Sequence, residues 1–250
     1  MIRRLALLLA LGAPVAAQDR VAGYDEMGPD LQAMQDDPFM NPGMLWVGEG
    51  ADLWEATPEG GGPACASCHG AANDSMRGVA ARCPAYDAIS DSTVDLPGRI
   101  TLCQTRHQGT AALSRDSRPL IALTAFVARQ SAGLPITPDP DPRLTPLRSE
   151  GAALFQSRMG QLNLSGAQCH DDNAGGRLLA ALIPQAHPTG YPQYRLEWEE
   201  MGPLQRRFDN CLTGVRADPF ASGSREYIGL ELYLMERAAG MRVEAPAIRP

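Results

Sequence analysis

The sequence CASCH at residues 65–69 decides how the rest of this chain is interpreted. A cysteine, two spacer residues, a second cysteine and a histidine form a specific signal for covalent haem attachment. On a helix these three residues share one face, so two thiols can bond the haem vinyl groups while the histidine reaches the iron. A disulfide or redox pair of Cys65 and Cys68 is the competing interpretation, and the adjoining His69 favours haem.

A second, incomplete copy of this motif lies 101 residues further along the chain. EGADLW (49–54) matches EGAALF (150–155), and the same offset aligns CASCH with GAQCH (166–170). Gly166 then stands where the first cysteine of the motif would be. Self-similarity at a fixed spacing is the signature of a repeated structural unit. The repeat therefore predicts a second haem site that lacks one of its two attachment cysteines.

The repeat continues to the end of the chain at a slightly larger offset. LPGRITLC (96–103) matches LQRRFDNC (204–211), and IALTAFVARQSAG (121–133) matches IGLELYLMERAAG (228–240). The last two segments have apolar residues at helical spacing and end at a glycine, which predicts helices. No segment shows a convincing alternating strand pattern, so we expect a mostly α fold. Five prolines between residues 135 and 146 predict an extended, semi-rigid linker between the copies.

The N-terminus has the features of a secretory signal peptide. Residues 1–17 combine two arginines, a short apolar run and a small-residue cleavage site. That run is too short to span a bilayer, and we expect an exported protein without a membrane segment. We therefore expect an N-terminal extension over 18–49, a first domain over 50–145 and a second, active-site domain over 146–250.

Charge and composition exclude one class of partner. The net charge is −7 and becomes −9 without the signal peptide, so binding of nucleic acid by bulk electrostatics is not expected. All 22 basic residues are arginine, which weakens the evidence that any single arginine carries. Six cysteines in an exported chain would by default form three disulfides, and the alternative is that they serve a cofactor.

Two cysteines at matching positions of the repeat, Cys103 and Cys211, are candidates for the second axial ligand of each haem iron. A repeat preserves local geometry, which favours a shared role as thiolate ligands over a disulfide or two buried thiols. Cys83 has no cysteine counterpart and is expected to be a plain buried or free thiol. The competing axial ligands are Met76 or His107 in the first half and His187, Met201 or Met235 in the second.

An arginine precedes each of these two cysteines by one helical turn. Arg99 lies before Cys103, and Arg207 lies before Cys211. A guanidinium in this place would lower the pKa of the thiol, and it would also hold an anionic substrate. A solvated helix face is the competing interpretation for both arginines. Arg237 adds to the basic residues of the second half.

With these motifs the sequence resembles the SoxA family, the larger cytochrome subunits of the thiosulfate-oxidising Sox system. The resemblance covers nearly all of the chain after the signal peptide. It rests on GEGADLW before CASCH, on RITLC, on GQLNLSGAQCHD, on QRRFDNC and on EYIGLELYLMERAAG.

The resemblance implies two tandem cytochrome c-like domains in the periplasm and a heterodimer with the cytochrome SoxX. It implies oxidative conjugation of thiosulfate to a cysteine of the carrier protein SoxY, with electrons leaving through haem. The first haem c would be attached to Cys65 and Cys68, with His69 and Cys103 on its iron. The second would use Cys169, His170 and Cys211, with Cys211 also forming a persulfide intermediate. The substrate arginine of the family falls on Arg207, and Arg237 is a weaker candidate.

Gly166 departs from the family motif, and three outcomes are open for the second haem. Cys169 alone holds the second haem by one thioether, attachment fails, or the glycine is an engineered or erroneous substitution. We favour the single thioether, because both axial ligands remain. Two other functions are also open: a non-catalytic dihaem electron carrier, and a thiosulfate dehydrogenase that forms tetrathionate.

Overall fold

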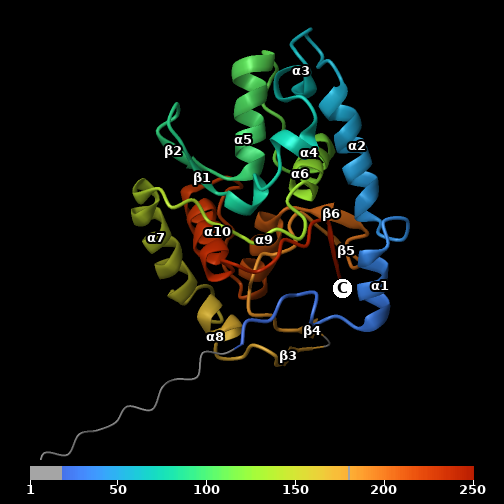
Figure 1. Cartoon of the computed structure of the whole chain (residues 1–250). Coiled ribbons are helices and arrows are strands. Elements are labelled where there is room, and N and C mark those ends of the chain that lie inside the picture. The colour runs from blue at the N-terminus through green and yellow to red at the C-terminus, as the bar shows by residue number, and fades with distance from the viewer. Residues whose placement is uncertain (1–18, 180) are drawn as a thin grey trace, which may run out of the picture.

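The computed structural model describes residues 19–179 and 181–250, so the predicted signal peptide lies outside the described residues. Helices dominate the molecule, as expected (Figure 1). No helix among the described residues is both long enough and apolar enough to cross a membrane. The α-helices are α1 (Pro29–Asp36), α2 (Gly43–Glu55), α3 (Cys65–His69), α4 (Ala72–Ser75), α5 (Leu96–Cys103), α6 (Arg118–Arg129), α7 (Thr145–Gln156), α8 (Gly166–His170), α9 (Leu204–Gly214) and α10 (Arg225–Arg237).

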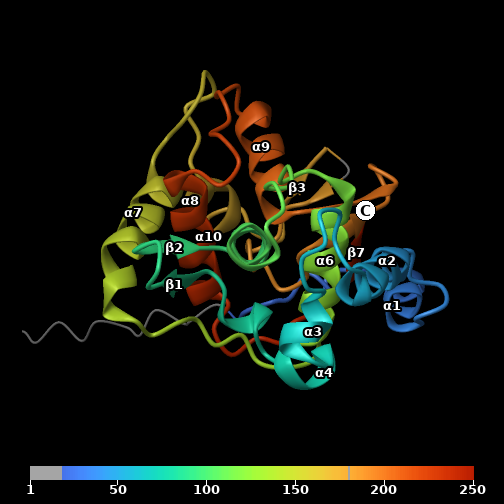
Figure 2. The same cartoon turned by 90° about the horizontal axis from the view of Figure 1, so that it is seen from above.

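Two pairs of packed helices lie on opposite sides of the molecule, α2 with α6 and α7 with α10 (Figures 1 and 2). A glycine stands at each crossing. A Cβ at Gly50 would collide with the backbone of Ala122, and a Cβ at Gly151 would collide with the backbone of Gly229. Helix backbones approach this closely only where side chains are absent. The glycine shared by EGADLW and EGAALF is therefore a requirement of helix packing.

Short strands connect the helices, and the sequence did not predict them. β1 (Ala85–Asp87) pairs with β2 (Ser92–Val94), and β5 (Gln193–Arg195) pairs with β6 (Glu200–Gly202), each antiparallel. At two or three residues a strand is too short to show alternation. The remaining strands are β3 (Arg177–Leu178), β4 (Ala181–Leu182) and β7 (Ala247–Arg249); β3 pairs with β4, and β7 joins β5 in parallel.

The two main hairpins extend the sequence repeat. An offset of 108 residues superposes the register of β1–β2 on that of β5–β6, so that Asp87 and Ser92 correspond to Arg195 and Glu200. The same offset relates Arg99 to Arg207 and Cys103 to Cys211 on the helices that follow. Each hairpin therefore leads into a helix with an arginine and a cysteine one turn apart, α5 in the first copy and α9 in the second.

The segment before α2 packs on the C-terminal part of the chain. Gln35, in α1, accepts hydrogen bonds from the Ile248 amide and the Arg249 guanidinium of β7, each at 2.9 Å. Asn41 donates to the Pro246 carbonyl at 3.0 Å. Helix α2 begins at Gly43, so the boundary predicted at residue 50 falls inside this helix.

The proline-rich segment between the repeat copies is not a free spacer. Ile136 is 1% exposed, and its amide donates to the Met241 carbonyl at 2.8 Å. The Thr137 amide donates to the Ala81 carbonyl at 2.9 Å. The extended conformation expected from the prolines is therefore fixed by hydrogen bonds on both sides. The segment includes the 3₁₀ turn η3 (Pro142–Leu144), and the other short helical turns are η1 (Ala80–Arg82) and the π-helical η2 (Gln104–Gln108).

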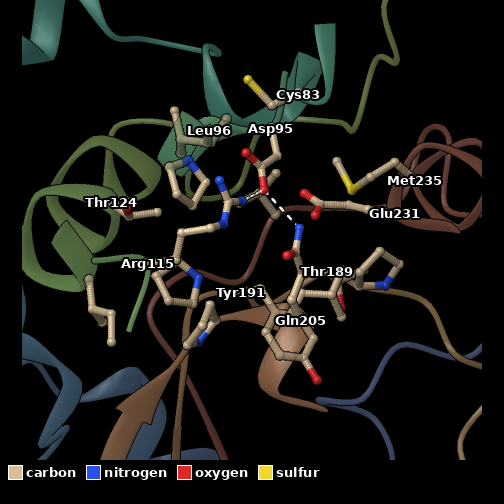
Figure 3. A pocket seen from close by; sticks show the side chains of 18 of the residues that line it. Cys83, Asp95, Leu96, Arg115, Thr124, Thr189, Tyr191, Gln205, Glu231 and Met235 are labelled. Carbon is tan, nitrogen blue, oxygen red and sulfur yellow. Dashed lines mark hydrogen bonds and ion pairs between the residues drawn. The ribbon is translucent and has the colours of Figure 1, made fainter. Parts of the chain in front are cut away.

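A cavity lined by residues of both halves of the molecule contains a small group of polar side chains (Figure 3). Asp95 accepts hydrogen bonds from Arg115 and, at 2.9 Å, from the amide of Gln205, which lies 110 residues further along the chain. Glu231 of α10 points toward Asp95 (Figure 3). Burial, and then the charge of Asp95, raise the pKa of Glu231 to about 8, so this carboxyl is mostly protonated at neutral pH.

Candidate functional site

The first Cys-His segment forms a single helical turn. Helix α3 carries Cys65, Cys68 and His69, and it ends at Gly70, whose φ of +65° suits glycine. All six cysteines of the chain are free thiols, so the disulfide interpretation is wrong. Cys65 is half-buried, and Gln108 donates to its sulfur at 3.6 Å. Two free thiols therefore lie on the same turn as a histidine.

The histidine of this turn faces Cys103 at the end of α5. The His69 Nε2 and the Cys103 Sγ are 3.9 Å apart. A metal held between an imidazole nitrogen and a thiolate would separate them by about 4.3 Å, the sum of two bonds of about 2.0 and about 2.3 Å as found at zinc. The observed spacing is slightly shorter than this, so a small outward shift would let both atoms bind one haem iron.

The arginine beside Cys103 does not activate its thiol. Burial raises the pKa of Cys103, and the nearby Arg99 offsets this only in part. The expectation of a lowered pKa is therefore wrong for this cysteine. The reason is that burial of the thiol outweighs the charge of Arg99. Arg99 pairs with Asp87 at 2.6 Å, and Arg106 pairs with the same carboxylate at 2.8 Å. The two guanidinium groups and Ser90 hold the pKa of Asp87 well below its usual range.

The second Cys-His segment is also one helical turn, built differently at its start. Ser165 and Gln168 form a reciprocal capping box at the N-terminus of α8. Gly166 opens the helix, and a Cβ at this residue would lie 2.7 Å from the Phe155 ring. Phe155 is 4% exposed, so its ring has little room to move. The absence of a side chain at residue 166 is therefore part of the packing of this turn.

His170 is oriented by a backbone carbonyl. Its Nδ1 lies 2.7 Å from the Pro184 oxygen, which can only accept, so Nδ1 carries the proton and Nε2 keeps a lone pair. Burial lowers the pKa of His170, and the charges of Arg207 and Arg237 act in the same direction. A neutral imidazole whose other nitrogen donates to a carbonyl is the usual form of a metal-ligating histidine.

Arg207 lies within electrostatic range of this histidine, and Cys211 lies within electrostatic range of Cys169. Burial raises the pKa of Cys169, and the charge of Cys211 adds to the effect, so the two sulfurs are within electrostatic range. Tyr191 lies in the range of both Arg207 and Cys211, and burial raises its pKa to about 12. Among residues 19–179 and 181–250, no carboxylate forms an ion pair with Arg207. The position of Asp87 is taken by Arg195, which pairs with Glu197 instead.

The other candidates have different surroundings. Arg237 donates to Asp171 at 2.5 Å and stacks on Phe155 at 4.8 Å, so its charge is already neutralised. Cys83 is buried, as expected, and burial raises its pKa to about 12. The alternative ligands are placed as follows: Met201 and Met235 are buried in apolar clusters, Met76 packs against one of these clusters, His107 is exposed, and His187 Nδ1 donates to the Val21 carbonyl.

One pair of aromatic residues beside each histidine was missed by the sequence analysis. The Trp54 ring is tilted against two neighbours, with ring centroids 5.7 Å from His69 and 5.8 Å from Phe126. In the second copy Phe155 takes the place of Trp54, and Tyr233 takes the place of Phe126. The Phe155 ring centroid lies 6.4 Å from that of His170 and 5.5 Å from that of Tyr233. The repeat contained the signal, because these aromatic positions match at the same offsets as the motifs around them.

The residues present fit a haem group at both places. The first place offers two thiols and a histidine nitrogen that faces a third thiol, and the second offers one thiol, a lone-pair nitrogen and a second thiol nearby. The second place differs in having one attachment cysteine and in Arg207, which pairs with no carboxylate of the described residues.

Comparison with known proteins gives consistent results. Residues 49–136 match the family model described as SoxA/TsdA, cytochrome c domain. "L-cysteine S-thiosulfotransferase subunit SoxA" from Pseudaminobacter salicylatoxidans is 36% identical over 85% of this chain and 75% of that protein. The protein of the same name from Rhodovulum sulfidophilum is 34% identical over 91% of this chain and 79% of its own length.

The fold agrees with a solved structure as well. The chain matches the crystal structure of SoxXA from P. pantotrophus with a TM-score of 0.88 and 31% identity, over 92% of this chain and 87% of that one. The cytochrome c-like fold is thereby established over most of the described residues. With identities above 30% across this much of both sequences, the chain belongs to the SoxA family.

Proposed function

We propose that this protein conjugates thiosulfate oxidatively to a cysteine of the carrier protein SoxY. The names of its relatives support an L-cysteine S-thiosulfotransferase subunit, and the match to a SoxXA structure supports SoxX as its partner. We place the reaction in the periplasm, because residues 1–17 have the composition of a secretory signal peptide. Two cytochrome c-like units, 50–145 and 146–250, would follow an N-terminal extension over 18–49.

Arg207 is the observation that carries this proposal. Its guanidinium lies near His170 and Tyr191, one helical turn before Cys211, and no carboxylate of the described residues pairs with it. A thiosulfate dianion needs such a cation, because hydrogen bonds between ionised groups are about twice as strong as neutral ones. Arg99, at the matching position, pairs with Asp87 and has no comparable freedom.

The same residues would hold two haem c groups. Cys65, Cys68, His69 and Cys103 would hold the first, whereas Cys169, His170 and Cys211 would hold the second. When bound, haem supplies an acceptor for electrons released by the reaction. We propose that Cys169 attaches the second haem by one thioether, because a side chain at Gly166 would collide with Phe155.

The chain's own residues would perform three tasks in the reaction. Arg207 binds the anion, and a persulfide on Cys211 bonds to thiosulfate as two electrons leave and is regenerated when the SoxY thiolate takes the whole thiosulfate group. Tyr191 and Phe155 help to limit water around the site. Overall, a sulfur–sulfur bond forms between the terminal sulfur of thiosulfate and the SoxY cysteine. The thiol loses its proton, and two electrons leave toward SoxX. Charge and atoms balance in this exchange, since thiosulfate and the thiol give an S-thiosulfonate, one proton and two electrons.

Mass spectrometry tests this proposal most directly. We expect intact-mass and peptide analysis to show extra sulfur on Cys211 and haem on the peptide that contains Cys169. A pyridine haemochrome spectrum separates one thioether from two, because the remaining vinyl group shifts the absorption band. Cys211 found only as an unmodified thiol would count against its role in transfer. Thiosulfate oxidation to tetrathionate without SoxY would favour the dehydrogenase, and no thiosulfate turnover at all would favour a plain electron carrier.

A further inference from the structure

The described N-terminal residues lie across the loop that orients His170. Gln185 in this loop makes two hydrogen bonds to them: its Oε1 accepts from the Val21 amide at 2.9 Å, and its Nε2 donates to the Asp19 carbonyl at 3.1 Å. His187 donates from Nδ1 to the Val21 carbonyl at 3.1 Å. Residues 19–22, called the N-terminal strap below, are thus bonded to both ends of a three-residue segment.

The strap is also anchored on α10 and the turn after it. Arg20 donates to the Ala239 carbonyl at 2.6 Å and to the Arg237 carbonyl at 3.3 Å. The Arg237 side chain in turn donates to Asp171 at 2.5 Å and to the Gln185 carbonyl at 3.4 Å. Arg20, His170, Asp171, Gln185, His187 and Arg237 together line one hollow. Residues far apart in the sequence therefore enclose His170 on this side.

The bond between the loop and His170 lies directly beside the strap contacts. Pro184, whose oxygen accepts from His170 Nδ1 at 2.7 Å, is the residue before Gln185. A shift of Gln185 would move this carbonyl, because the two residues share a planar peptide unit. The hydrogen bond to the far nitrogen of a ligating histidine fixes its ring and raises its basicity.

The first site has no equivalent support. Among the described residues, His69 makes its single hydrogen-bond contact through Nε2, with Cys103, and none of its Nδ1 contacts reaches a carbonyl. That site has two attachment cysteines. The second site has one, and its hold on a haem depends more on the histidine.

We propose that the N-terminal strap and Gln185 position His170, and so compensate at the second site for the missing attachment cysteine. This inference rests on the proposed haem site at Cys169 and His170. The strap acts through the 184–187 loop and touches no reacting atom, so Gln185, Val21 and Arg20 are positioning residues. The N-terminal segment then has a role inside its own chain, at the site where we place the chemistry.

Two alanine substitutions of the same kind test the proposal in the full chain bound to SoxX. Gln185→Ala removes two hydrogen bonds of the strap to the loop, and Gln35→Ala removes two hydrogen bonds of the same N-terminal segment to β7. Amide hydrogen exchange over residues 166–171 and 184–187 is the first measurement. We expect roughly 3- to 10-fold faster exchange there in Gln185→Ala, from the loss of hydrogen bonds, and no change there in Gln35→Ala.

The midpoint potential of the second haem is the second measurement. We expect it to rise in Gln185→Ala, because a less basic histidine stabilises the oxidised iron less, and to stay unchanged in Gln35→Ala. Gln185→Glu should give an intermediate effect, since it still accepts from Val21 but cannot donate to the Asp19 carbonyl. Unchanged exchange over 166–171 in Gln185→Ala, or equal changes in both alanine variants, would overturn the strap proposal.

The two proposals fail in different ways. Hydrogen exchange reports on the strap whether or not haem is attached to Cys169. Peptide mass of the unsubstituted protein reports on attachment alone. If the protein carries no haem on Cys169 and Gln185→Ala still exchanges faster, the strap does position the loop. The proposed second haem site would then be refuted.

Discussion

The two Cys-His turns of this molecule share their surroundings but differ in charge and attachment. Both lie beside an aromatic ring of the preceding long helix, Trp54 in one and Phe155 in the other. In the first, Asp87 neutralises Arg99, and two thiols are available. In the second, Arg195 stands in place of the acid, and Gly166 stands in place of a thiol. A duplicated unit has thus kept its packing, while one copy has an arginine, Arg207, that pairs with no carboxylate in the part of the chain that the structure describes.

This difference is expected if one Cys-His turn carries electrons and the other binds the substrate. A site that only carries electrons gains from neutralised charges, because an unpaired charge in an apolar environment is costly. A site that binds a dianion needs a guanidinium whose charge is not already satisfied. The first turn has the former arrangement and the second has the latter, which agrees with the proposal that chemistry occurs at the second.

The largest expected effect separates the two arginines. Arg207→Gln should lower kcat/KM for thiosulfate by roughly 10- to 100-fold, the value of about 1.5–3 kcal/mol for a hydrogen bond to a charged group. Arg99→Gln is the matched control, and it should leave kcat/KM nearly unchanged while lowering stability. Steady-state kinetics with SoxY, together with urea unfolding, measure both. Equal losses of kcat/KM in the two variants would remove the distinction between the sites.

Restoring the missing cysteine should weaken the second site rather than repair it. Gly166→Cys places a Cβ 2.7 Å from a Phe155 ring that is 4% exposed, and overpacking of this kind costs about 1–3 kcal/mol. We expect a lower urea midpoint, with an unchanged m-value. Combining it with Phe155→Leu should recover part of the loss, and a Gly166→Cys protein as stable as the original would show that the ring moves readily.

The sequence predicted the parts of this comparison that depend on local spacing. The repeat predicted the helices around the two Cys-His segments, and it singled out Cys103, which lies 3.9 Å from His69. It did not predict the hairpins, because their strands have three residues at most. The contrast between Arg99 and Arg207 depends on Asp87 and Arg195, which lie on those hairpins. Extending the offset of 108 residues toward the N-terminus would have revealed that exchange.

Contacts between distant segments were outside the reach of the sequence. Nothing in the composition of residues 19–22 indicates that they bond to Gln185, more than 160 residues away. The collision between residue 166 and Phe155 is also a tertiary effect. Pattern arguments report which residues share a face of one element, whereas these contacts depend on how elements pack.

Transferring the acid of the first site should give a smaller change than removing the arginine. Arg195→Asp places a carboxylate where Asp87 stands in the first hairpin, and we expect it to pair with Arg207. An ion pair at a partly exposed place is worth about 0.2–1 kcal/mol, so KM for thiosulfate should rise by roughly 1.5- to 5-fold with little change in kcat. Arg195→Gln is the control, because it removes the native charge without adding the acid. A similar KM in both variants would argue against pairing with Arg207.

The smallest expected effect is on the pH dependence of stability, where the two halves should respond in opposite directions. The pKa of Asp87 is held well below its ordinary 3.8, so its ion pairs stabilise the fold above that pH and are lost as the pH falls. The pKa of Glu231 is raised from 4.5 to about 8, so its contribution is complete below 4.5 and is lost as the pH rises through 8. Urea midpoints between pH 3 and 9 should therefore fall at both ends. Glu231→Gln should flatten the alkaline side alone and Asp87→Asn the acidic side alone, and a curve changed at both ends by either substitution would contradict this separation.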